Sequence, residues 1–320
     1  MKEIFAPIWI HPELIFSFSL ALLLDLAFGE PPNCFHPVAW LGRLLSLLER
    51  LAPKEKRAQL LYGFILSLLC IISFSLPAAF LLIWLKEISP LAFLLGGAFF
   101  LKISFAIKKL RQEAIKVKKH LEKGELERAK ENMPSLVSRE VKDLGSEGLV
   151  AATVESVAEN TCDSFIAPLF YLALAGIPGA LIYRAVNALD GTIGYHGKYE
   201  YLGKFAARLD DAFNFIPARI AGILLAISAL ILGKNALNSL KVMLQEHNRT
   251  QSPNAGWPIS ATAGALKVAL EKRDCYIIGK ADDLLGPSKI EEAVSLMNLT
   301  SLLGSLIYLS LGMVCLVFKT

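Results

Sequence analysis

The sequence lacks the short motifs that mark many soluble enzymes. It contains no GxxxxGK[ST] phosphate loop, no GxSxG elbow, no HExxH pair and no GxGxxG fingerprint after a strand. Its cysteines form no CxxC pair and no Cys/His cluster, and they lie far apart at Cys34, Cys70, Cys162, Cys275 and Cys315. As far as motifs can, these absences exclude the standard nucleotide-binding and hydrolase folds. We expect no disulfide framework and no zinc, haem or flavin.

A strong charge imbalance is also missing. The 33 Lys and Arg residues against 29 Asp and Glu residues give a formal net charge of +4, and no basic stretch carries interleaved aromatic residues. Such a mild, dispersed charge excludes nucleic acid as a partner. The N-terminus has no positive region and no small-residue cleavage site, so the first apolar run is predicted to be a retained helix and not a signal peptide.

Apolar residues, by contrast, are abundant. They make up 54% of the 320 residues, and the mean hydropathy is +0.49, values typical of an integral membrane protein. A helix needs about 20 apolar residues to cross the hydrocarbon of a bilayer. We therefore expect an all-α, polytopic helical membrane protein that forms a single integral membrane domain over 1–320. Its apolar segments are expected at about 14–28, 60–85, 88–107, 164–183, 212–233 and 293–318.

The polar segments at about 30–59, 102–163 and 234–292 are expected to be cytoplasmic amphipathic helices and loops. A very short connection at Glu87 predicts an antiparallel hairpin of two apolar helices. Its outer ends adjoin Lys- and Arg-rich segments, which the positive-inside rule places in the cytoplasm. Residues 102–131 have the spacing of an amphipathic helix, and Lys102 is expected to extend its ammonium towards the interface. We expect the protein to be a multi-pass protein of the cell membrane.

The apolar segment 164–183 contains helix-breaking residues. Pro168 lies near its start, and Gly176-Ile177-Pro178-Gly179 lies in its second half. Irregular backbone at membrane depth is tolerated where it is buried in protein or lines a cavity. We therefore expect this segment to be re-entrant or cavity-lining, which keeps the polar residues on both sides of it on the cytoplasmic side.

Three acids share one face of the helix predicted before this segment. Glu155, Glu159 and Asp163 are spaced four residues apart, so a helix aligns them in one row. Like charges at this spacing repel one another, and a bound Mg²⁺, a lysine or an arginine would relieve the repulsion. A solvated acidic stripe is the alternative. The surrounding Ala and Val residues favour a buried helix, in which ionisable groups are costly and often functional.

Two further segments combine arginines with acids and amides. The first contains Arg184, Asn187 and Asp190, and the second contains Arg208, Asp210, Asp211, Asn214 and Arg219. An arginine presents a planar fork to phosphate or carboxylate, and neighbouring aspartates can bind a hard cation. Most single Asp-Asp pairs are turn or capping residues, but arginines flank this pair at a membrane boundary.

Two loops add candidate binding residues. Residues 252–258 form a rigid loop with Asn254 and an aromatic plate, Trp257. This loop is either an ordinary turn or a lid over a flat, bulky substrate. His36 follows the first apolar run, and a lone histidine is more often structural than catalytic.

Five ordered blocks resemble one family. They are L-L-L-D-L-A-F-G-E-P-P-N-C-F-H-P-V with L-G-R following, A-T-V-E-S-V-A-E-N-T-C-D-S-F-I-A-P-L-F, Y-R-A-V-N-A-L-D with I-G-Y, A-A-R-L-D-D-A-F-N-F-I-P-A-R and N-A-G-W-P. Together they resemble the membrane-bound cobinamide-phosphate synthase family, called CobD or CbiB, from about Asp25 to Pro258. Glu30 stands where the family often has Asp, and Cys162 where it commonly has Val.

The resemblance implies a late step of cobalamin biosynthesis. In it, the free propionate of adenosylcobyric acid forms an amide with (R)-1-aminopropan-2-ol or its O-phosphate, which gives adenosylcobinamide or its phosphate. A carboxylate does not acylate an amine unaided, so activation by ATP, and with it Mg²⁺, is expected. The acidic and basic groups of the middle third are expected to converge in one pocket at the inner leaflet, with the active site on the cytoplasmic side. Other enzymes of the cobalamin pathway are further candidate partners.

The roles expected in that reaction follow the chemistry of each side chain. Metal binding or base catalysis is assigned to Glu155, Glu159, Asp163, Asp210 and Asp211, the first three being the tentative Mg²⁺ ligands. Phosphate binding is assigned to Arg184, Arg208 and Arg219, amide orientation to Asn160, Asn187 and Asn254, and further substrate contacts to Asp190, Asn214, Trp257 and His36. A multi-pass transporter and a membrane scaffold for corrinoid enzymes remain the alternatives. The chain lacks the paired halves that most transporters have.

Overall fold

The computed structural model describes residues 11, 13–30, 37–137, 141–195, 197–273 and 275–319. The chain divides into two compact units. The first unit comprises Met1–Ala106, Ala167–Phe213 and Leu306–Thr320, and the second comprises Ile107–Ile166 and Asn214–Ser305. Helices α9 (Lys204–Ile231) and α12 (Ser288–Lys319) contribute residues to both units.

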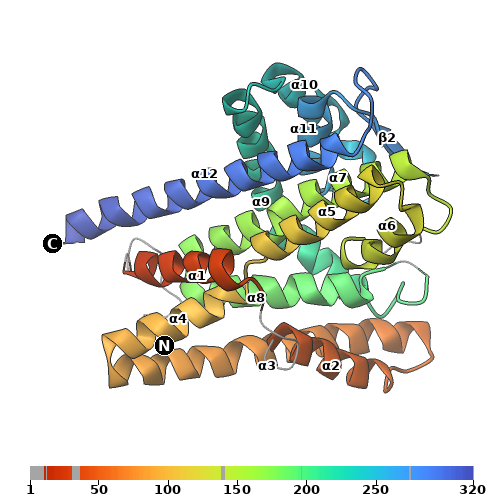
Figure 1. Ribbon diagram of the computed structural model, residues 1–320. Coiled ribbons are helices and arrows are strands. Elements are labelled where there is room, and N and C mark those ends of the chain that lie inside the picture. Colours follow the sequence, from red (N-terminus) through yellow and green to blue (C-terminus); the bar gives the residue numbers. More distant parts are fainter. Residues whose placement is uncertain are drawn as a thin grey trace. The chain divides into compact units, whose positions relative to one another are not determined.

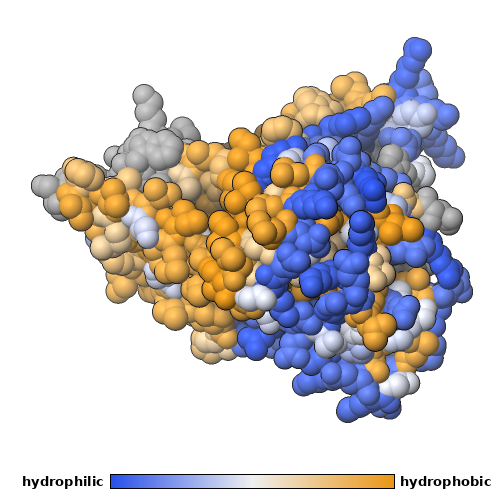
Figure 2. Space-filling view, turned by 90° about the horizontal axis from the view of Figure 1, so that it is seen from above, coloured by the Kyte–Doolittle hydropathy of each residue, from blue (hydrophilic) through white to orange (hydrophobic). Residues whose placement is uncertain are grey.

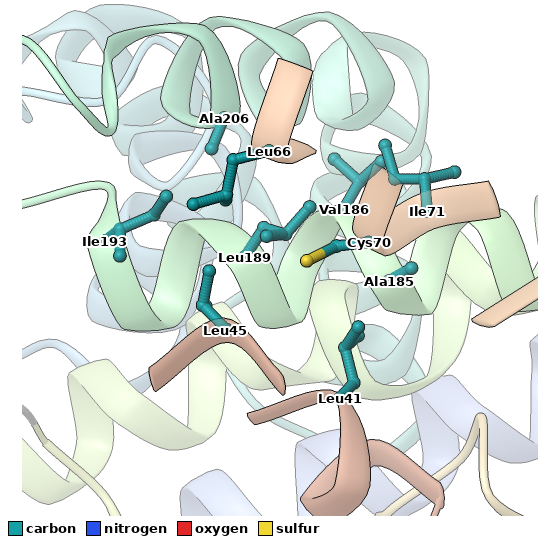
Figure 3. Close-up of a cluster of buried hydrophobic side chains, with 10 residues drawn as sticks. All are labelled: Leu41, Leu45, Leu66, Cys70, Ile71, Ala185, Val186, Leu189, Ile193 and Ala206. Carbon is teal, nitrogen blue, oxygen red and sulfur yellow. The ribbon is translucent and has the colours of Figure 1, made fainter. Parts of the chain in front are cut away.

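The first unit is a bundle of helices (Figure 1). Besides parts of α9 and α12 it contains α1 (Leu14–Phe28), α2 (Pro37–Glu49), α3 (Lys56–Ile88), α4 (Pro90–Lys102) and α8 (Ala167–Ile193). Its main core joins α2, α3, α8 and the start of α9. Figure 3 shows the buried side chains of that core facing one another: Leu41, Leu45, Leu66, Cys70, Ile71, Ala185, Val186, Leu189, Ile193 and Ala206.

Helices α3 and α4 form the predicted hairpin, joined at Ser89. Ser89 caps α4, because its side chain accepts a hydrogen bond from the backbone N–H of Ala92 at 3.0 Å, and Pro90 occupies the first turn, where its missing N–H costs nothing. The two helices pack on each other along the hairpin, as Figure 1 shows. The apolar helix α4 ends at Lys102, earlier than the predicted 107.

The sequence predicts that Lys102 extends its ammonium towards the interface. In the structure, Lys102 instead forms a buried ion pair. Its Nζ lies 2.9 Å from Oδ1 of Asp25, and the side chains of Lys102 and Asp25 are 8% and 0% exposed. Glu30 lies 3.8 Å from the same ammonium. A charge inside an apolar bundle is costly unless it is paired, so the pair fixes α1 against the end of α4. Gly97 allows this close approach, because a Cβ there would lie 2.9 Å from Oγ of Ser17 on α1.

Helix α8 is broken where the sequence predicts a break. Ala175 and Gly176 have non-helical dihedral angles, and Gly176 has φ of 64°, which glycine adopts without strain. The rings of Tyr171 and Tyr183 stack with centroids 5.5 Å apart, whereas twelve residues of straight helix would rise about 18 Å. The chain therefore folds back at Gly176, and the second arm of α8 returns towards the end at which the first began.

Close contact between the two arms of α8 depends on Gly179. A Cβ there would lie 2.6 Å from the carbonyl oxygen of Tyr171 on the first arm, so a side chain would push the arms apart. Tyr171 also donates a hydrogen bond from its hydroxyl to the carbonyl of Phe213 at 2.9 Å. This hydrogen bond fixes the folded-back segment to α9.

The second unit contains shorter helices and a small hairpin. In chain order they are α5 (Ile107–Glu122), α6 (Leu126–Asn132), η1 (Met133–Ser135), α7 (Ser146–Thr161), the π-helical turn η2 (Cys162–Ile166), the rest of α9, α10 (Ala236–Glu246), η3 (His247–Arg249), α11 (Gly256–Leu266), the antiparallel strands β1 (Leu270–Lys272) and β2 (Tyr276–Ile278), and the start of α12.

The prediction of a single amphipathic helix over 102–131 is wrong. Gly124, with φ of 73°, separates α5 from α6.

The described residues include five helical stretches long and apolar enough to cross a membrane: Lys56–Ile88, Pro90–Glu122, Ser146–Ile193, Lys204–Ile231 and Ser288–Phe318. Helix α1 is a shorter apolar helix. Large apolar side chains such as Phe64, Ile72 and Phe80 of α3 are exposed, as expected for helices that face lipid. Figure 2 shows broad hydrophobic surfaces and separate regions of charged side chains. The predicted class, an all-α polytopic membrane protein, is confirmed.

We expect Lys102→Met to destabilise the protein by about 3–5 kcal/mol, the usual cost of removing one partner of a buried ion pair. The double variant Asp25→Asn/Lys102→Met should recover most of that loss, because neither charge is then left alone. Thermal unfolding of the detergent-solubilised protein measures both changes, with Lys54→Met as the exposed control. The single variant Asp25→Asn is measured in the same way. If the stability lost in the double variant equals the sum of the losses in Lys102→Met and Asp25→Asn, the pair does not stabilise the fold as described.

Candidate functional site

Helix α7 carries the predicted acids in a mostly buried segment. Its residues Leu149–Ala158 are all buried, including Glu155, which is 6% exposed. Glu159 and Asp163 are half-buried. The α-helical spacing holds for Glu155 and Glu159, but η2 begins at Cys162, so Asp163 lies in a wider π turn and does not continue that row. Single π turns are rare and are frequent at functional sites.

The π turn contacts α9 through an amide. Asn214 is 3% exposed, and its Oδ1 accepts a weak hydrogen bond from Sγ of Cys162 at 3.8 Å. In the preceding turn the side-chain amide of Asn160 donates to the carbonyl of Ser156 at 2.9 Å, and its Oδ1 accepts from the hydroxyl of Ser164 at 3.3 Å. Two predicted amides, Asn160 and Asn214, therefore lie on or against the same irregular turn.

Arg219 lies between two aromatic rings one and a half turns further along α9. Its guanidinium carbon is 3.7 Å from the centroid of Phe215 and 4.7 Å from that of Trp257. Nη1 donates to the carbonyl of Phe215 at 2.5 Å and to Oδ1 of Asn254 at 3.0 Å. In the part of the chain that the structure describes, no carboxylate forms an ion pair with Arg219. Within the described residues, the groups that contact the guanidinium are therefore all neutral.

Asn254 and Trp257 approach Arg219 from the turn before α11 and from the first turn of α11, because the predicted loop 252–258 gives way to this helix at Gly256. Asn254 is 4% exposed, and its backbone N–H donates to the hydroxyl of Ser252 at 3.2 Å. Gly222 lets α9 approach the start of α11, since a Cβ there would lie 3.3 Å from the carbonyl of Trp257. The structure thus brings Arg219 together with Asn254 and Trp257, both of which follow it by more than 30 residues in the sequence.

His247 belongs to this cluster, and sequence reasoning missed it. Its ring stacks on Trp257 with centroids 4.0 Å apart and an interplanar angle of 20°. The result is a layered stack of Phe215, Arg219, Trp257 and His247. Burial, and secondarily the charge of Arg219, lower the pKa of His247 below its usual value of 6.5. Because it lies ten residues before Trp257 with no helical spacing to it, no local pattern could have identified it.

The first unit holds the other predicted polar residues. On the second arm of α8, Nη1 of Arg184 donates to Oδ1 of Asn187 at 3.2 Å. At the start of α9, Arg208 is 76% exposed and lies 3.9 Å from Asp211, a weak contact. Asp190 of α8 lies within electrostatic range of Asp211. These residues flank the core in which Ala206 of α9 packs against α8.

The structure does not test several of the predictions made from the sequence. His36 lies outside the described residues. Among the described residues, no group of three or more His, Cys, Asp or Glu side chains is arranged to hold a metal ion, and the magnesium assignment stays a prediction. The expectation of one pocket shared by all the predicted residues, including Asp210, also stays a prediction.

Fold and site define a class: a helical membrane protein with a partly buried cluster of arginine, amides and aromatic rings. The family model described as CobD/Cbib protein matches residues 18–297, and the chain therefore belongs to that family. Proteins named "Cobalamin biosynthesis protein CobD" from Dehalococcoides mccartyi (strain CBDB1) and Clostridium tetani (strain Massachusetts / E88) are 42% and 35% identical to it. The matches cover 89% and 90% of this chain and 93% and 95% of those proteins.

A further relative is archaeal. The protein named "Probable cobalamin biosynthesis protein CobD" from Methanothermobacter thermautotrophicus is 38% identical over 90% of this chain and 94% of its own length. No solved structure has a significant match to this chain.

The stack on Trp257 predicts a pH dependence of stability. With the pKa of His247 lowered in the folded state, the unfolded chain binds a proton first as the pH falls below about 6.5. The free energy of unfolding should therefore decrease below that pH and be unaffected by this group above it. His247→Phe keeps a stacked ring without a titrating group, so the variant should lose less stability between pH 6.5 and 5. Thermal unfolding across this range measures the difference, and parallel curves for the two proteins would contradict the stacking account.

Proposed function

We propose that this protein is an adenosylcobinamide or adenosylcobinamide-phosphate synthase. In this reaction the free propionate of adenosylcobyric acid is joined through an amide bond to (R)-1-aminopropan-2-ol or its O-phosphate. Membership of the CobD/Cbib family and the names of its relatives support a role in cobalamin biosynthesis. The observation that carries the finer proposal is the half-buried Arg219, whose guanidinium has neutral partners and could bind an anionic substrate group.

Amide formation needs an activated acid. A carboxylate oxygen is a poor leaving group, so we propose that the carboxylate attacks the γ-phosphorus of ATP and releases ADP, which gives an acyl phosphate. The neutral amine then attacks the acyl carbon, and phosphate leaves with the former carboxylate oxygen and one proton from the amine nitrogen, which gives the amide. The amine is an ammonium ion in solution and must lose one proton before it attacks, so a general base is required.

The second unit supplies groups suited to these steps. Glu155 and Glu159 are one turn apart and are candidates for the base that accepts the ammonium proton. Arg219 has a planar fork that matches a phosphate, and Asn254 holds it in orientation through the 3.0 Å hydrogen bond. The ring of Trp257 is a candidate wall for the flat corrin ring.

Further predicted residues belong to the first unit, and their roles are proposed from the chemistry of their side chains. We propose that Arg184 and Arg208 bind phosphate oxygens and that Asn187, held by Arg184, orients an amide of the corrinoid. Asp190, Asp210 and Asp211 are candidates for orienting the ammonium group of the amine. Electrostatic attraction of this kind positions a cationic substrate before the reaction.

Mg²⁺ fits this donor set as a companion of the nucleotide. Magnesium is usually held by one or two carboxylates together with substrate phosphates, and Glu155 and Glu159 would supply those carboxylates. When bound, the ion would neutralise charge on the phosphate oxygens. We propose that the site lies on the cytoplasmic side of the cell membrane, where ATP is available.

The reaction itself is tested with the full chain purified in detergent. Adenosylcobyric acid, aminopropanol O-phosphate, ATP and Mg²⁺ should give the amide, detected by mass spectrometry, and omission of ATP should abolish it. Free aminopropanol in a parallel reaction shows which amine is preferred. A transporter or a scaffold would form no product under any of these conditions, and that result would end the proposal.

Glu155→Gln should reduce turnover about 100-fold or more, because positioned general bases contribute about 10²–10⁴ to rates. The variant keeps the size and hydrogen-bonding capacity of the side chain, so its thermal unfolding should resemble that of the parent. Glu127→Gln, at an exposed carboxylate of α6, is the matched control. An unaltered rate in Glu155→Gln would remove this residue from the mechanism.

Arg219→Lys should raise the KM for the phosphate-bearing substrate about tenfold or more while changing kcat less, since hydrogen bonds to charged groups contribute about 1.5–3 kcal/mol. Lysine keeps the charge but loses the planar fork that stacks between Phe215 and Trp257. The matched control is Arg128→Lys, an exposed arginine paired with Glu125. Equal kinetics for the two variants would contradict the assignment of Arg219.

A further inference from the structure

Helix α2 has one face in the core of the first unit and another face exposed. Leu41 and Leu45 are buried against α3 and α8 (Figure 3). Trp40, one residue before Leu41, and Leu47, two residues after Leu45, lie on other sides of the helix and are 51% and 59% exposed. Leu51, just beyond the helix, is 68% exposed. A short helix with exposed Trp and Leu next to basic residues is typical of a helix at a membrane surface.

The exposed side of α2 borders a hollow of about 550 Å³. Arg43 and Arg50, two helical turns apart, both line it, together with Ser46 and Thr192 of α8. Gly42 also lines it, and a Cβ there would meet nothing within 4 Å. The hydroxyls of Ser46 and Thr192 already donate to the backbone carbonyls of Gly42 and Ala188. The donors that the hollow offers are therefore the two guanidinium groups, which suit a phosphate.

The acid nearest to these arginines is already occupied. Oε1 of Glu49 accepts hydrogen bonds from Nζ of Lys198 at 2.7 Å and from the hydroxyl of Tyr199 at 2.9 Å, and the hydrogen bond from Lys198 lowers the pKa of Glu49. Within the described residues, neither Arg43 nor Arg50 forms an ion pair or a side-chain hydrogen bond. Arg50 contributes to the electrostatic attraction that lowers the pKa of Glu49, but among the described residues no carboxylate binds either guanidinium directly.

A second hollow on α2 is apolar. It has a volume of about 410 Å³ and is lined by residues of α2, α3 and α4, among them Trp40, Phe74, Pro77, Leu81 and Phe99. The middle of α3, which supplies three of these side chains, is part of a stretch apolar enough to cross a membrane. An apolar groove on a lipid-facing helix suits an acyl chain, since a lipid tail there would cover exposed side chains such as Trp40.

We propose that α2 binds an anionic phospholipid, with the phosphate between Arg43 and Arg50 and an acyl chain in the apolar groove on the neighbouring side of the helix. The two arginines supply the charge complementarity, and the apolar groove favours a lipid over a free phosphate. The bound lipid would hold α2 at the membrane surface. This site is independent of the amide-forming reaction and uses none of the residues assigned to it.

Native mass spectrometry of the full chain in mild detergent tests the proposal, with phosphatidylglycerol and phosphatidylcholine added in equal amounts. The parent protein should retain phosphatidylglycerol preferentially. Arg43→Gln/Arg50→Gln should reduce that retention about tenfold or more, because it removes two charged hydrogen-bond donors. Lys54→Gln/Arg57→Gln removes the same charge from exposed positions nearby and should retain the lipid as the parent does.

Three results would overturn the proposal. Equal retention of the two lipids by the parent would show that the site does not prefer an anionic headgroup. Equal loss in the test and control variants would reduce the effect to net charge. Release of phosphatidylglycerol by excess inorganic phosphate would assign the hollow to a soluble phosphate. Ser46→Asp, at an exposed position of α2, should also weaken lipid retention, and it provides the test if the double arginine variant does not fold.

Discussion

The structure depends on one constraint, that a charge inside an apolar helical bundle must have partners. Asp25 and Lys102 meet it in the simplest way, with an acid and a base 2.9 Å apart and almost no exposed surface. Because the opposite charges offset each other, the pair stabilises the contact of α1 with α4. The same rule separates structural from functional charges elsewhere in the chain.

Arg219 meets the constraint differently. Two aromatic faces, a backbone carbonyl and the amide of Asn254 surround its guanidinium. These groups stabilise a cation through their dipoles and ring quadrupoles but do not cancel its charge. A half-buried cation with neutral partners can attract an anion. The reaction that we propose passes through an acyl phosphate, and a cation that binds phosphate oxygens is therefore required. The stack with Trp257 and His247 also fixes its orientation before a substrate arrives, which reduces the entropy lost on binding.

Much of the fold could be predicted from the sequence because hydropathy and helix breakers act locally. The apolar run 14–28 coincides with α1, and the break at Gly176 follows from the two glycines and the proline of Gly176-Ile177-Pro178-Gly179. Local patterns could not predict the burial of Lys102, because its partner Asp25 lies 77 residues earlier. The π turn at Cys162 escaped prediction for the same reason, since its contact with Asn214 is formed only in the folded chain. Among the site residues, residue type identified Arg219, Asn254 and Trp257, whereas His247 required the three-dimensional stack.

In the reaction that we propose, the corrinoid carboxylate is activated by phosphorylation and is then captured by the amine. The most direct measurement follows the carboxylate oxygen, using adenosylcobyric acid labelled with ¹⁸O in its free propionate and the purified full-length protein with ATP, Mg²⁺ and the amine. The account predicts one ¹⁸O atom in inorganic phosphate for each amide formed. Amide product accompanied by unlabelled phosphate, or no ATP-dependent amide at all, would contradict it.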